Sequence, residues 1–342
     1  MNDVLSPQII ISPDLYEIIE DLKGATINVR SNPYFSTSLE EDELGTNGGV
    51  TILDDSALSD LDPEDGYTTI INSDRHIFGY DESMLCIPAL EGIGYFFSHS
   101  LVLLGKENYL PVIQLSFRFY TRSKTIANGK NKITYCADTN VESKRDYVKG
   151  RRNLIENYVP AHSVLLLDGP LVGSQVTSEN VEMNRNLLQK DIIPFFIVKN
   201  SESLMVVDSR PDLKGRFNSD LEWAYRVLKK SQMTPLFYYQ DYYNGEQNKV
   251  FTYMKMFDSS PVRVEFHRDT YKQYKNEISK IFNVISYQLL SQGDPTNPQP
   301  RIVAIAEEFA RKALDMENAK KMLEEINIVP TMNATRFGWR HE

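Results

Sequence analysis

A short apolar run that ends in a carboxylate constrains the fold of this 342-residue chain more than any other feature. Residues 163–167 read Ser-Val-Leu-Leu-Leu, and Asp168 and Gly169 follow directly. A run this apolar over so few residues is typical of a strand that is covered on both faces, in the parallel part of an α/β sheet. Ligands gather at the carboxyl ends of such strands, where a carboxylate pairs with a cation or binds a hard metal ion. The alternative is that Asp168 only caps a turn.

The rest of the chain alternates between strand-like and helix-like segments. Aromatic and β-branched residues predict strands at 68–71, 76–80, 92–104, 110–120, 192–198, 234–243, 249–257 and 261–266. Amphipathic patterns predict helices at 12–24, 141–158, 178–190, 218–230, 278–290 and 302–326. Strands that come first and are followed by alternating helices and strands predict a mixed α/β sheet flanked by helices.

The composition leaves room for a core and for a polyanionic partner. Hydrophobic residues make up 41% of the chain and aromatic residues 11%, which excludes a disordered or fibrous protein. The net charge of −10 at first argues against nucleic acid. However, residues 36–67 hold ten acidic residues and no Lys or Arg, so the remainder is neutral overall. That remainder can gather its basic side chains in one groove.

Two further observations limit the class of protein. The two cysteines, Cys86 and Cys136, exclude a disulfide framework and a four-cysteine zinc site. No apolar run approaches the ~20 residues that span a bilayer, and no signal-peptide pattern is visible. We therefore expect a cytoplasmic protein without membrane association.

The first part of the chain differs from the rest. We predict that residues 1–69 form an N-terminal extension, with a capped helix and an acidic linker or insertion, ahead of one larger domain over residues 70–342. The acidic part is interpreted as a solvated surface loop. The alternative is a segment that docks a partner or mimics DNA.

A second carboxylate resembles the first in its setting. Asp81 ends the short β-like run 77–80, and a long β-rich stretch follows it. Two carboxylates from neighbouring strands can share metal ions, and ions ~3.5–4 Å apart are the usual machinery for phosphodiester hydrolysis. The alternative for Asp81 is an ordinary turn carboxylate.

Taken in order, these motifs resemble the NurA nuclease family. The resemblance runs from Tyr80-Asp81-Glu82-Ser83 through a charged helix to Leu-Leu-Leu-Asp168-Gly-Pro-Leu and a strand before Lys199, and it covers roughly residues 70–312. It implies an α/β fold with an RNase H-like mixed sheet. It also implies a Mn²⁺- or Mg²⁺-dependent DNA exo- and endonuclease. Such proteins work as homodimers on a HerA-type hexameric ATPase, in DNA end processing or phage defence.

The resemblance gives roles to single residues. Asp81 and Asp168 match metal-binding aspartates, and Lys199 matches a lysine that could contact the scissile phosphate. The family also places a glutamate on the preceding helix, where this chain offers three acids, each of which can also be an ordinary solvated charge: Glu142, Asp146 and Glu156. Glu142 is favoured because Glu156 lies near the helix end. The hypothesis is that Asp81, Asp168 and Glu142 hold two Mn²⁺ or Mg²⁺ ions.

The sequence also departs from the family. Glu82 stands where the family usually has Gly. The family's C-terminal Tyr and His are also absent, because this chain reads Asn297-Pro298-Gln299-Pro300-Arg301 and then Ala304-Ile305-Ala306-Glu307. His267, at a predicted strand end, is the nearest substitute for the missing His, although a lone histidine is more often structural. These departures support a second hypothesis, a catalytically weak or inactive NurA-like subunit that acts as a scaffold or DNA guide on the ATPase.

Basic residues suggest where DNA binds. The predicted helix 141–158 carries five of them: Lys144, Arg145, Lys149, Arg151 and Arg152. They could hold the phosphate backbone, or they could form a solvated face. Helical geometry points residue 151 about 200° away from residue 149, so Arg151 is expected to contribute least to DNA binding.

Overall fold

The computed structural model describes residues 48–53, 57–105, 108–128, 133–172, 177–241, 248–314, 321 and 324–325. All of them belong to one compact unit that begins at Ser36. The helix expected over residues 12–24, part of the acidic segment and most of the expected helix beyond residue 314 lie outside the described residues.

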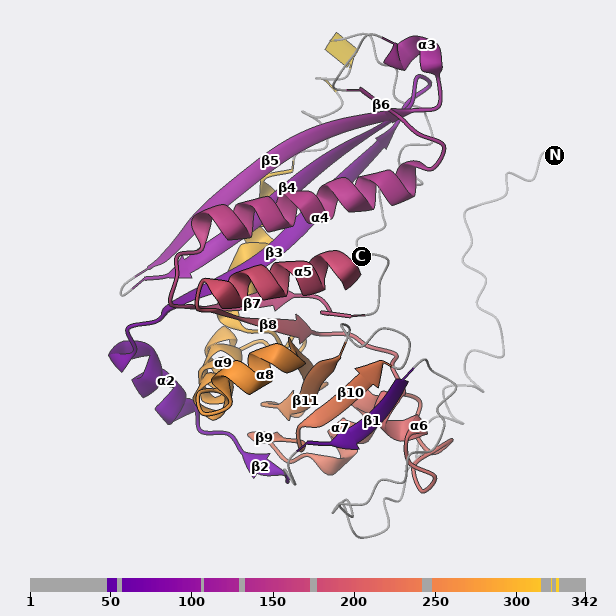
Figure 1. The fold of residues 1–342 in the computed structure, drawn as a ribbon. Helices are drawn as coiled ribbons and strands as arrows, with labels where there is room; N and C mark the ends of the chain where they lie inside the picture. The colour runs from indigo at the N-terminus through magenta and orange to yellow at the C-terminus, as the bar shows by residue number, and fades with distance from the viewer. Residues whose placement is uncertain are drawn as a thin grey trace, which may run out of the picture. The chain divides into compact units, whose positions relative to one another are not determined.

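One mixed sheet organises the described part of the chain (Figure 1). Its strand order is β1-β10-β11-β12-β8-β7-β3-β4-β5-β6, and β2 and β9 pair beside this path. The strands are β1 (Gly48–Ile52), β2 (Ser59–Asp60), β3 (His76–Pro88), β4 (Ile93–Leu104), β5 (Tyr109–Thr121), β6 (Ile133–Tyr135), β7 (Ser163–Asp168), β8 (Ile192–Val198), β9 (Gln232–Met233), β10 (Phe237–Asp241), β11 (Lys249–Lys255) and β12 (Val262–His267).

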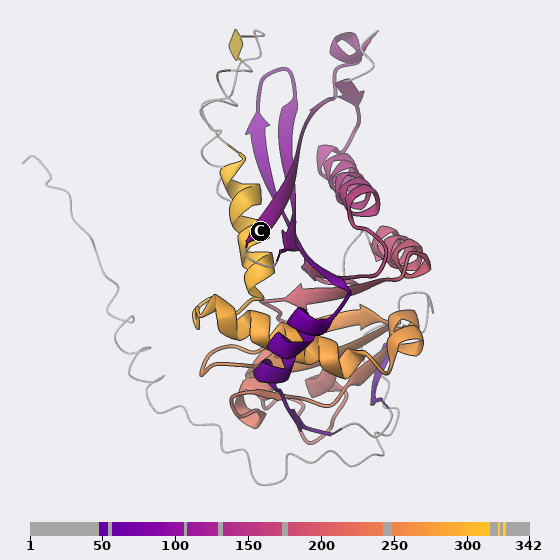
Figure 2. The ribbon, with the colours of Figure 1, turned by 90° about the vertical axis from the view of Figure 1, so that its left-hand side faces the viewer.

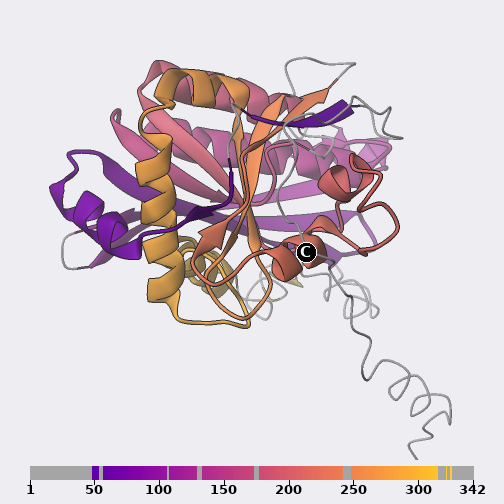
Figure 3. The same ribbon diagram turned by 90° about the horizontal axis from the view of Figure 1, so that it is seen from below.

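Helices cover both faces of the sheet. In the described residues they are α2 (Pro63–Asn72), α3 (Lys124–Ala127), α4 (Thr139–Tyr158), α5 (Thr177–Gln189), α6 (Met205–Asp208), α7 (Asp220–Val227), α8 (Arg268–Tyr274), α9 (Ile278–Gln292) and α10 (Arg301–Lys312). Figure 2 shows α4 and α5 on one face and α9 and α10 on the other. Seen from below, α2 lies beside α9 (Figure 3).

The middle of the sheet has the RNase H-like arrangement. Strands β3, β4 and β5 form an antiparallel meander. Strand β7 then pairs with β3 in parallel, and β8 pairs with β7 in parallel. The chain passes through α4 before β7 and through α5 between β7 and β8, as parallel pairing requires a crossover. The predicted fold class, a mixed sheet flanked by helices, is therefore confirmed.

The apolar run at residues 163–167 is buried on both faces, as its composition predicts. Leu166 packs in the cluster that contains Ile302 of α10, whereas Leu165 and Leu167 pack in the cluster that contains Leu154 of α4. Full burial of such a side chain stabilises the fold by about 1.5–3 kcal/mol. The alternation of faces along β7 also decides where its last residue, Asp168, points.

The strand predicted over residues 68–71 is wrong, because these residues lie within α2. The side chain of Asp62 accepts hydrogen bonds from the backbone N–H groups of Glu64 and Asp65, and Pro63 occupies the first turn. These signals start a helix and override the β propensity of a few residues. Strand β1 and much of α2 precede residue 70, so the extension predicted over residues 1–69 shares elements with the larger domain.

A glycine lets α4 approach the sheet closely. A Cβ atom added at Gly150 would overlap Nε2 of His99 on β4. His99 is fully buried and its Nδ1 lies 2.7 Å from the hydroxyl of Tyr80, so its ring has little freedom to move away. The glycine inside the helix, which costs helix propensity, is therefore explained by packing.

We expect Gly150→Ala to destabilise the protein although alanine is the better helix former. Overpacking costs about 1–3 kcal/mol, whereas the gain in helix propensity is about 0.5–1 kcal/mol. The measurement is the urea midpoint, with Asn153→Ala, an exposed position on the same helix, as the control that should be slightly stabilised. A Gly150→Ala variant more stable than the wild type would show that α4 can move away from β4.

Candidate functional site

Three parallel strands deliver charged residues to one edge of the sheet. Tyr80 pairs with Leu167, so the next residues, Asp81 and Asp168, lie level with each other. Asp168 pairs with Ile197 of β8, two residues before Lys199. Sequence reasoning placed Asp81 at a strand end, but β3 continues to Pro88 as an arm of the meander. Asp81 follows the last residue of β3 that pairs with β7.

The two aspartates face the same side of the sheet. Side chains alternate along a strand, so Asp81 shares a face with Gly79, and Asp168 shares one with Leu166. Gly79 lies against Ile302 of α10, and Leu166 packs in the same cluster as Ile302. Both carboxylates therefore lie on the α10 side.

Burial makes it energetically unfavourable for both carboxylates of this pair to be ionised. Asp81 is only 4% exposed, and its Oδ2 has no hydrogen-bond partner among the described residues. Burial, and then the charge of Asp168, raise the pKa of Asp81 well above its usual range. Burial also raises the pKa of Asp168, against the attraction of Lys199. A cation at this place would relieve both costs.

Lys199 is held beside the pair by residues that follow in the sequence. Its Nζ lies 3.1 Å from Oδ1 of Asp168 and 3.3 Å from Oε2 of Glu307 on α10, and it donates to Oε1 of Gln299 at 2.9 Å. Gln299 is 1% exposed and donates its Nε2 to Glu307 at 2.9 Å. The ammonium group is thus fixed from both sides.

The turn after Asp168 is fixed by a buried ion cluster. Gly169 has φ of +90°, a conformation that favours glycine, and the backbone N–H of Leu171 donates to Oε2 of Glu265 at 3.0 Å. Glu265 is fully buried and pairs with Lys249 at 2.6 Å and with Arg263 at 2.8 Å. Loss of one partner would leave an unpaired buried charge, so this cluster holds the turn in one place.

The other face of the same edge carries a second ion pair. Nη2 of Arg151 lies 2.7 Å from Oε1 of Glu82, and only 9% and 11% of these side chains are exposed. Arg151 also donates to Oδ1 of Asn180 at 3.2 Å. Sequence reasoning assigned Arg151 to the DNA surface, but the structure buries it against the sheet.

The three helix acids do not join the aspartates. Glu142 pairs with Arg145 at 2.8 Å, Asp146 accepts the hydroxyl of Tyr120 at 2.7 Å, and Glu156 pairs with Arg152 at 2.9 Å. The start of α4 contacts Tyr95 through Asn140, and Tyr95 pairs with Cys86, five residues beyond Asp81. Arg151 of the same helix contacts Glu82, the neighbour of Asp81, and Glu142 precedes Arg151 by nine residues, so it lies about 13 Å away along the helix.

His267 is not brought to this edge either. Its Nδ1 accepts the backbone N–H of Asp269 at 3.1 Å and so caps α8. Because Glu265 pairs with Phe196, His267 lies toward the start of β8, whereas Lys199 follows its end.

The remaining basic residues of α4 are largely paired. Arg152 also contacts Glu182 at 2.9 Å, and Lys149, 71% exposed, lies 4.0 Å from Asp146. Lys144 is exposed. The exposed end of α4 therefore carries mixed charges.

Sequence reasoning missed Gln299, Glu307 and the pair of Glu82 with Arg151. Gln299 and Glu307 lie in the segment that departs from the family pattern, so that departure was the one sequence feature that pointed to a change at the site. The helical angle between residues 149 and 151 did indicate that Arg151 faces away from the other basic residues.

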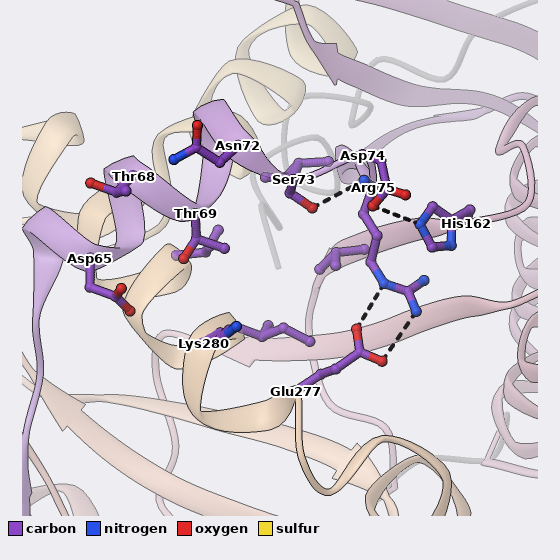
Figure 4. A pocket seen from close by; sticks show the side chains of 14 residues that line it. Asp65, Thr68, Thr69, Asn72, Ser73, Asp74, Arg75, His162, Glu277 and Lys280 are labelled. Carbon is purple, nitrogen blue, oxygen red and sulfur yellow. Dashed lines mark hydrogen bonds and ion pairs between the residues drawn. The ribbon is translucent and has the colours of Figure 1, made fainter.

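A cavity of about 500 Å³ lies at the opposite edge, where β3 and β7 begin (Figure 4). Arg75 bonds Glu277 at 2.9 Å and Asp191 at 3.1 Å there. His162 lies between Asp191 at 2.6 Å and Asp74 at 3.0 Å. These charged groups are all paired with one another, which suits a structural role better than catalysis.

The fold and the paired aspartates define a class of proteins with a buried acidic pair at the carboxyl end of the parallel strand pairing in an RNase H-like sheet. A family model described as the NurA domain matches residues 86–311. The chain therefore belongs to the NurA family. The matched range contains Asp168, Lys199 and Glu307, and it begins five residues after Asp81.

Three solved structures of low identity are similar to this chain. A "Crystal structure of NurA" matches with a TM-score of 0.50 and 9% identity, over 96% of this chain and 100% of that chain. The NurA nuclease from Sulfolobus solfataricus matches with a TM-score of 0.46 and 11% identity, over 75% and 86%. NurA bound to dAMP and manganese matches with a TM-score of 0.44 and 10% identity, over 80% and 94%. No protein with a curated description matches the sequence.

Within the described residues, no helix is both long and apolar enough to cross a membrane.

Asp81→Asn should stabilise the metal-free protein. The raised pKa means that the folded state keeps a proton that the unfolded chain releases near pH ~4. The stability of the wild type therefore falls as pH rises from there toward the raised folded-state pKa, and the variant lacks this loss. The measurement is the urea midpoint in EDTA between pH 5 and pH 8.

Glu142→Gln, which changes a partly exposed acid on α4, is the control and should keep the wild-type pH profile. Added Mn²⁺ should stabilise the wild type more than the Asp81→Asn variant. The same pH profile for Asp81→Asn and the wild type would contradict a raised pKa of Asp81 in the folded state.

Proposed function

We propose that this chain is a metal-dependent DNA nuclease that hydrolyses phosphodiester bonds at the edge formed by β3, β7 and β8. The observation that carries the proposal is the buried pair of Asp81 and Asp168, in which Oδ2 of Asp81 has no hydrogen-bond partner in the described part of the chain. Membership of the NurA family supports it. Related structures are described as a nuclease and as bound to dAMP and manganese.

Asp81 and Asp168 would hold the divalent ion, Mn²⁺ or Mg²⁺. Carboxylate oxygens are the ligands that these hard cations prefer, and Mg²⁺ is often bound through one or two carboxylates together with substrate phosphate. When bound, the ion would neutralise charge on the phosphate and lower the pKa of the attacking water. The sequence-based proposal of two ions relied on Glu142 as a third ligand, and Glu142 is paired with Arg145 instead.

Lys199 would contact the scissile phosphate. Burial opposes its charge, but the carboxylates around it, led by Asp168, raise its pKa, so the ammonium stays protonated. Gln299 and Glu307 hold the ammonium in one position. A fixed positive charge at the place where charge develops in the transition state favours the reaction without reorganisation.

The DNA backbone would reach this edge past the exposed basic residues of α4. Lys144, Arg145 and Lys149 are exposed or half-exposed there, so they would attract phosphates without reading sequence. Because Arg151 is buried and Arg152 is paired with Glu156 and Glu182, these two contribute less to the DNA surface.

A catalytically weak subunit that guides DNA is the second candidate function. The observation that favours it is the small number of ligands: the described residues contain no group of three or more His, Cys, Asp or Glu side chains that could hold a metal. The loss of the family's C-terminal Tyr and His points the same way.

Asp168→Asn should abolish cleavage while the protein stays folded. The change keeps the shape of the side chain and removes the charge that holds the ion. Mutation of residues that only support a metal ligand typically lowers activity by about 10- to 100-fold, so loss of the ligand itself should lower the cleavage rate at least about 100-fold. The measurement is cleavage of linear duplex and single-stranded DNA with Mn²⁺ or Mg²⁺.

In that assay Glu142→Gln is the matched control and should keep cleavage near the wild-type rate. Full cleavage by Asp168→Asn would sink the assignment of the site. A wild-type chain that cleaves neither substrate with either metal would favour the DNA-guiding subunit.

The family resemblance further supports a homodimer that works on a HerA-type hexameric ATPase in DNA end processing or phage defence. The segment before residue 70 carries the net negative charge of the chain and contains none of the sequence motifs of the site. Deletion of residues 1–30 should weaken the complex with such an ATPase and leave DNA cleavage unchanged. Sedimentation of the mixed proteins measures the complex, and an unchanged complex would place the docking surface elsewhere.

A further inference from the structure

Strand β4 buries two serine side chains close to the aspartates. Residues 98–100 read Ser-His-Ser within a strand that is otherwise largely apolar. Both serines are 0% exposed, and neither hydroxyl has a hydrogen-bond partner among the described residues. Burying a hydroxyl without a hydrogen bond is unfavourable, and an alanine would avoid this cost. Packing alone therefore does not explain why serine stands at these two positions.

Both hydroxyls lie on the α10 side of the sheet. Side chains alternate along a strand, so Ser98 and Ser100 share a face with Val102. Val102 packs in the cluster that contains Ile302 of α10. The residue between the serines, His99, lies on the other face, against α4. The two serines are therefore on the same side of the sheet as the aspartates.

The register between β3 and β4 places Ser100 directly opposite Asp81. The Cβ atoms of such cross-strand neighbours lie about 4.5–5.5 Å apart. Ser98 lies opposite Ser83, two residues or about 7 Å further along the strand. Three buried polar atoms without a partner in the described residues therefore lie in one row: Oδ2 of Asp81, Oγ of Ser100 and Oγ of Ser98.

Helix α10 packs against β3 and β4 on this face and gives the row no hydrogen bond (Figure 2). The buried residues of the helix have side chains that neither donate nor accept, namely Ile302, Val303, Ala306 and Ala310. Glu307 of the same helix is engaged with Lys199 and Gln299. The helix therefore does not supply the partner that the serine hydroxyls lack.

We infer that the hydroxyl of Ser100 holds a water molecule of the divalent ion that Asp81 and Asp168 would bind, and that Ser98 extends this hydrogen-bonded row. The inference rests on the proposed nuclease function for the presence of the ion. Mg²⁺ bound through one or two carboxylates usually keeps several waters, and each water needs acceptors. A serine oxygen accepts a hydrogen bond from such a water without adding charge. Ser100 is thus a positioning residue that acts through water.

The test compares metal binding with metal-free stability in the full chain. Ser100→Ala should lower the affinity for Mn²⁺ about 10- to 100-fold, as is typical when a residue that supports a metal site is lost. In EDTA, the urea midpoint of the same variant should be at least as high as that of the wild type, because the change removes a buried hydroxyl that has no partner. Calorimetric titration and the electron paramagnetic resonance signal of free Mn²⁺ measure the affinity.

Two further serine variants locate the effect. Ser98→Ala changes the same face further from Asp81, so it should lower the affinity less than Ser100→Ala does. Ser116 is a partly buried serine of β5 that lies opposite Phe97 and so faces α4. Ser116→Ala is therefore the matched control and should keep the wild-type affinity.

The affinities decide between the outcomes. An unchanged Mn²⁺ affinity in Ser100→Ala would overturn the inference, as would a greater loss in Ser98→Ala or Ser116→Ala. A fall of both the affinity and the metal-free urea midpoint in Ser100→Ala would show disturbed packing and would also contradict it. In each of these cases, wild-type binding that depends on Asp168 leaves the nuclease proposal standing. No Asp168-dependent Mn²⁺ in the wild type would instead contradict the proposed function itself.

Discussion

Two aspartates that the backbone holds level and the fold buries determine the electrostatics at the carboxyl end of the parallel pairing of β3 with β7. This pairing places the backbone of Asp81 beside that of Asp168. Burial raises the pKa of both, and for Asp81 the neighbouring charge adds to it. A folded chain gains no stability from such a pair. A cation bound between the two carboxylates would stabilise their ionised forms and offset the cost of burying them.

The positive charges that the chain itself supplies are divided between the two faces of the sheet. Lys199 lies on the α10 side, where Gln299 and Glu307 hold it, and Arg151 lies on the α4 side with Glu82. Strand geometry alone produces this division, because Asp81 and Glu82 are neighbours in sequence and must point to opposite faces. The close packing of α4, which Gly150 permits, brings Arg151 into reach. Fold and electrostatics are therefore set by the same few contacts.

Strong local patterns made most of the fold predictable. Apolar runs predicted β7 and β8, and the resemblance to the NurA family implied the RNase H-like class. Asp81 and Asp168 could be placed together as carboxylates on neighbouring strands, and Lys199 was added by the family resemblance. Long-range packing decided the rest. Helix α2 forms because its N-cap and its packing against α9 override the β propensity of its residues. The position of Arg151 around α4 turns its side chain toward the sheet, whereas Glu142 pairs with Arg145 near the start of the helix. No local pattern shows that a glutamine and a glutamate near the C-terminus hold a lysine a hundred residues earlier.

The central claim is that Asp81 and Asp168 together bind a divalent cation. The most direct measurement is a crystal structure of the wild-type chain soaked in Mn²⁺, with anomalous scattering recorded for manganese. The account predicts an anomalous peak in contact with a carboxylate oxygen of each aspartate, with the ion pair of Glu82 and Arg151 intact on the other face. A map without manganese at this edge, with Lys199 still paired to Asp168 at saturating Mn²⁺, would contradict it.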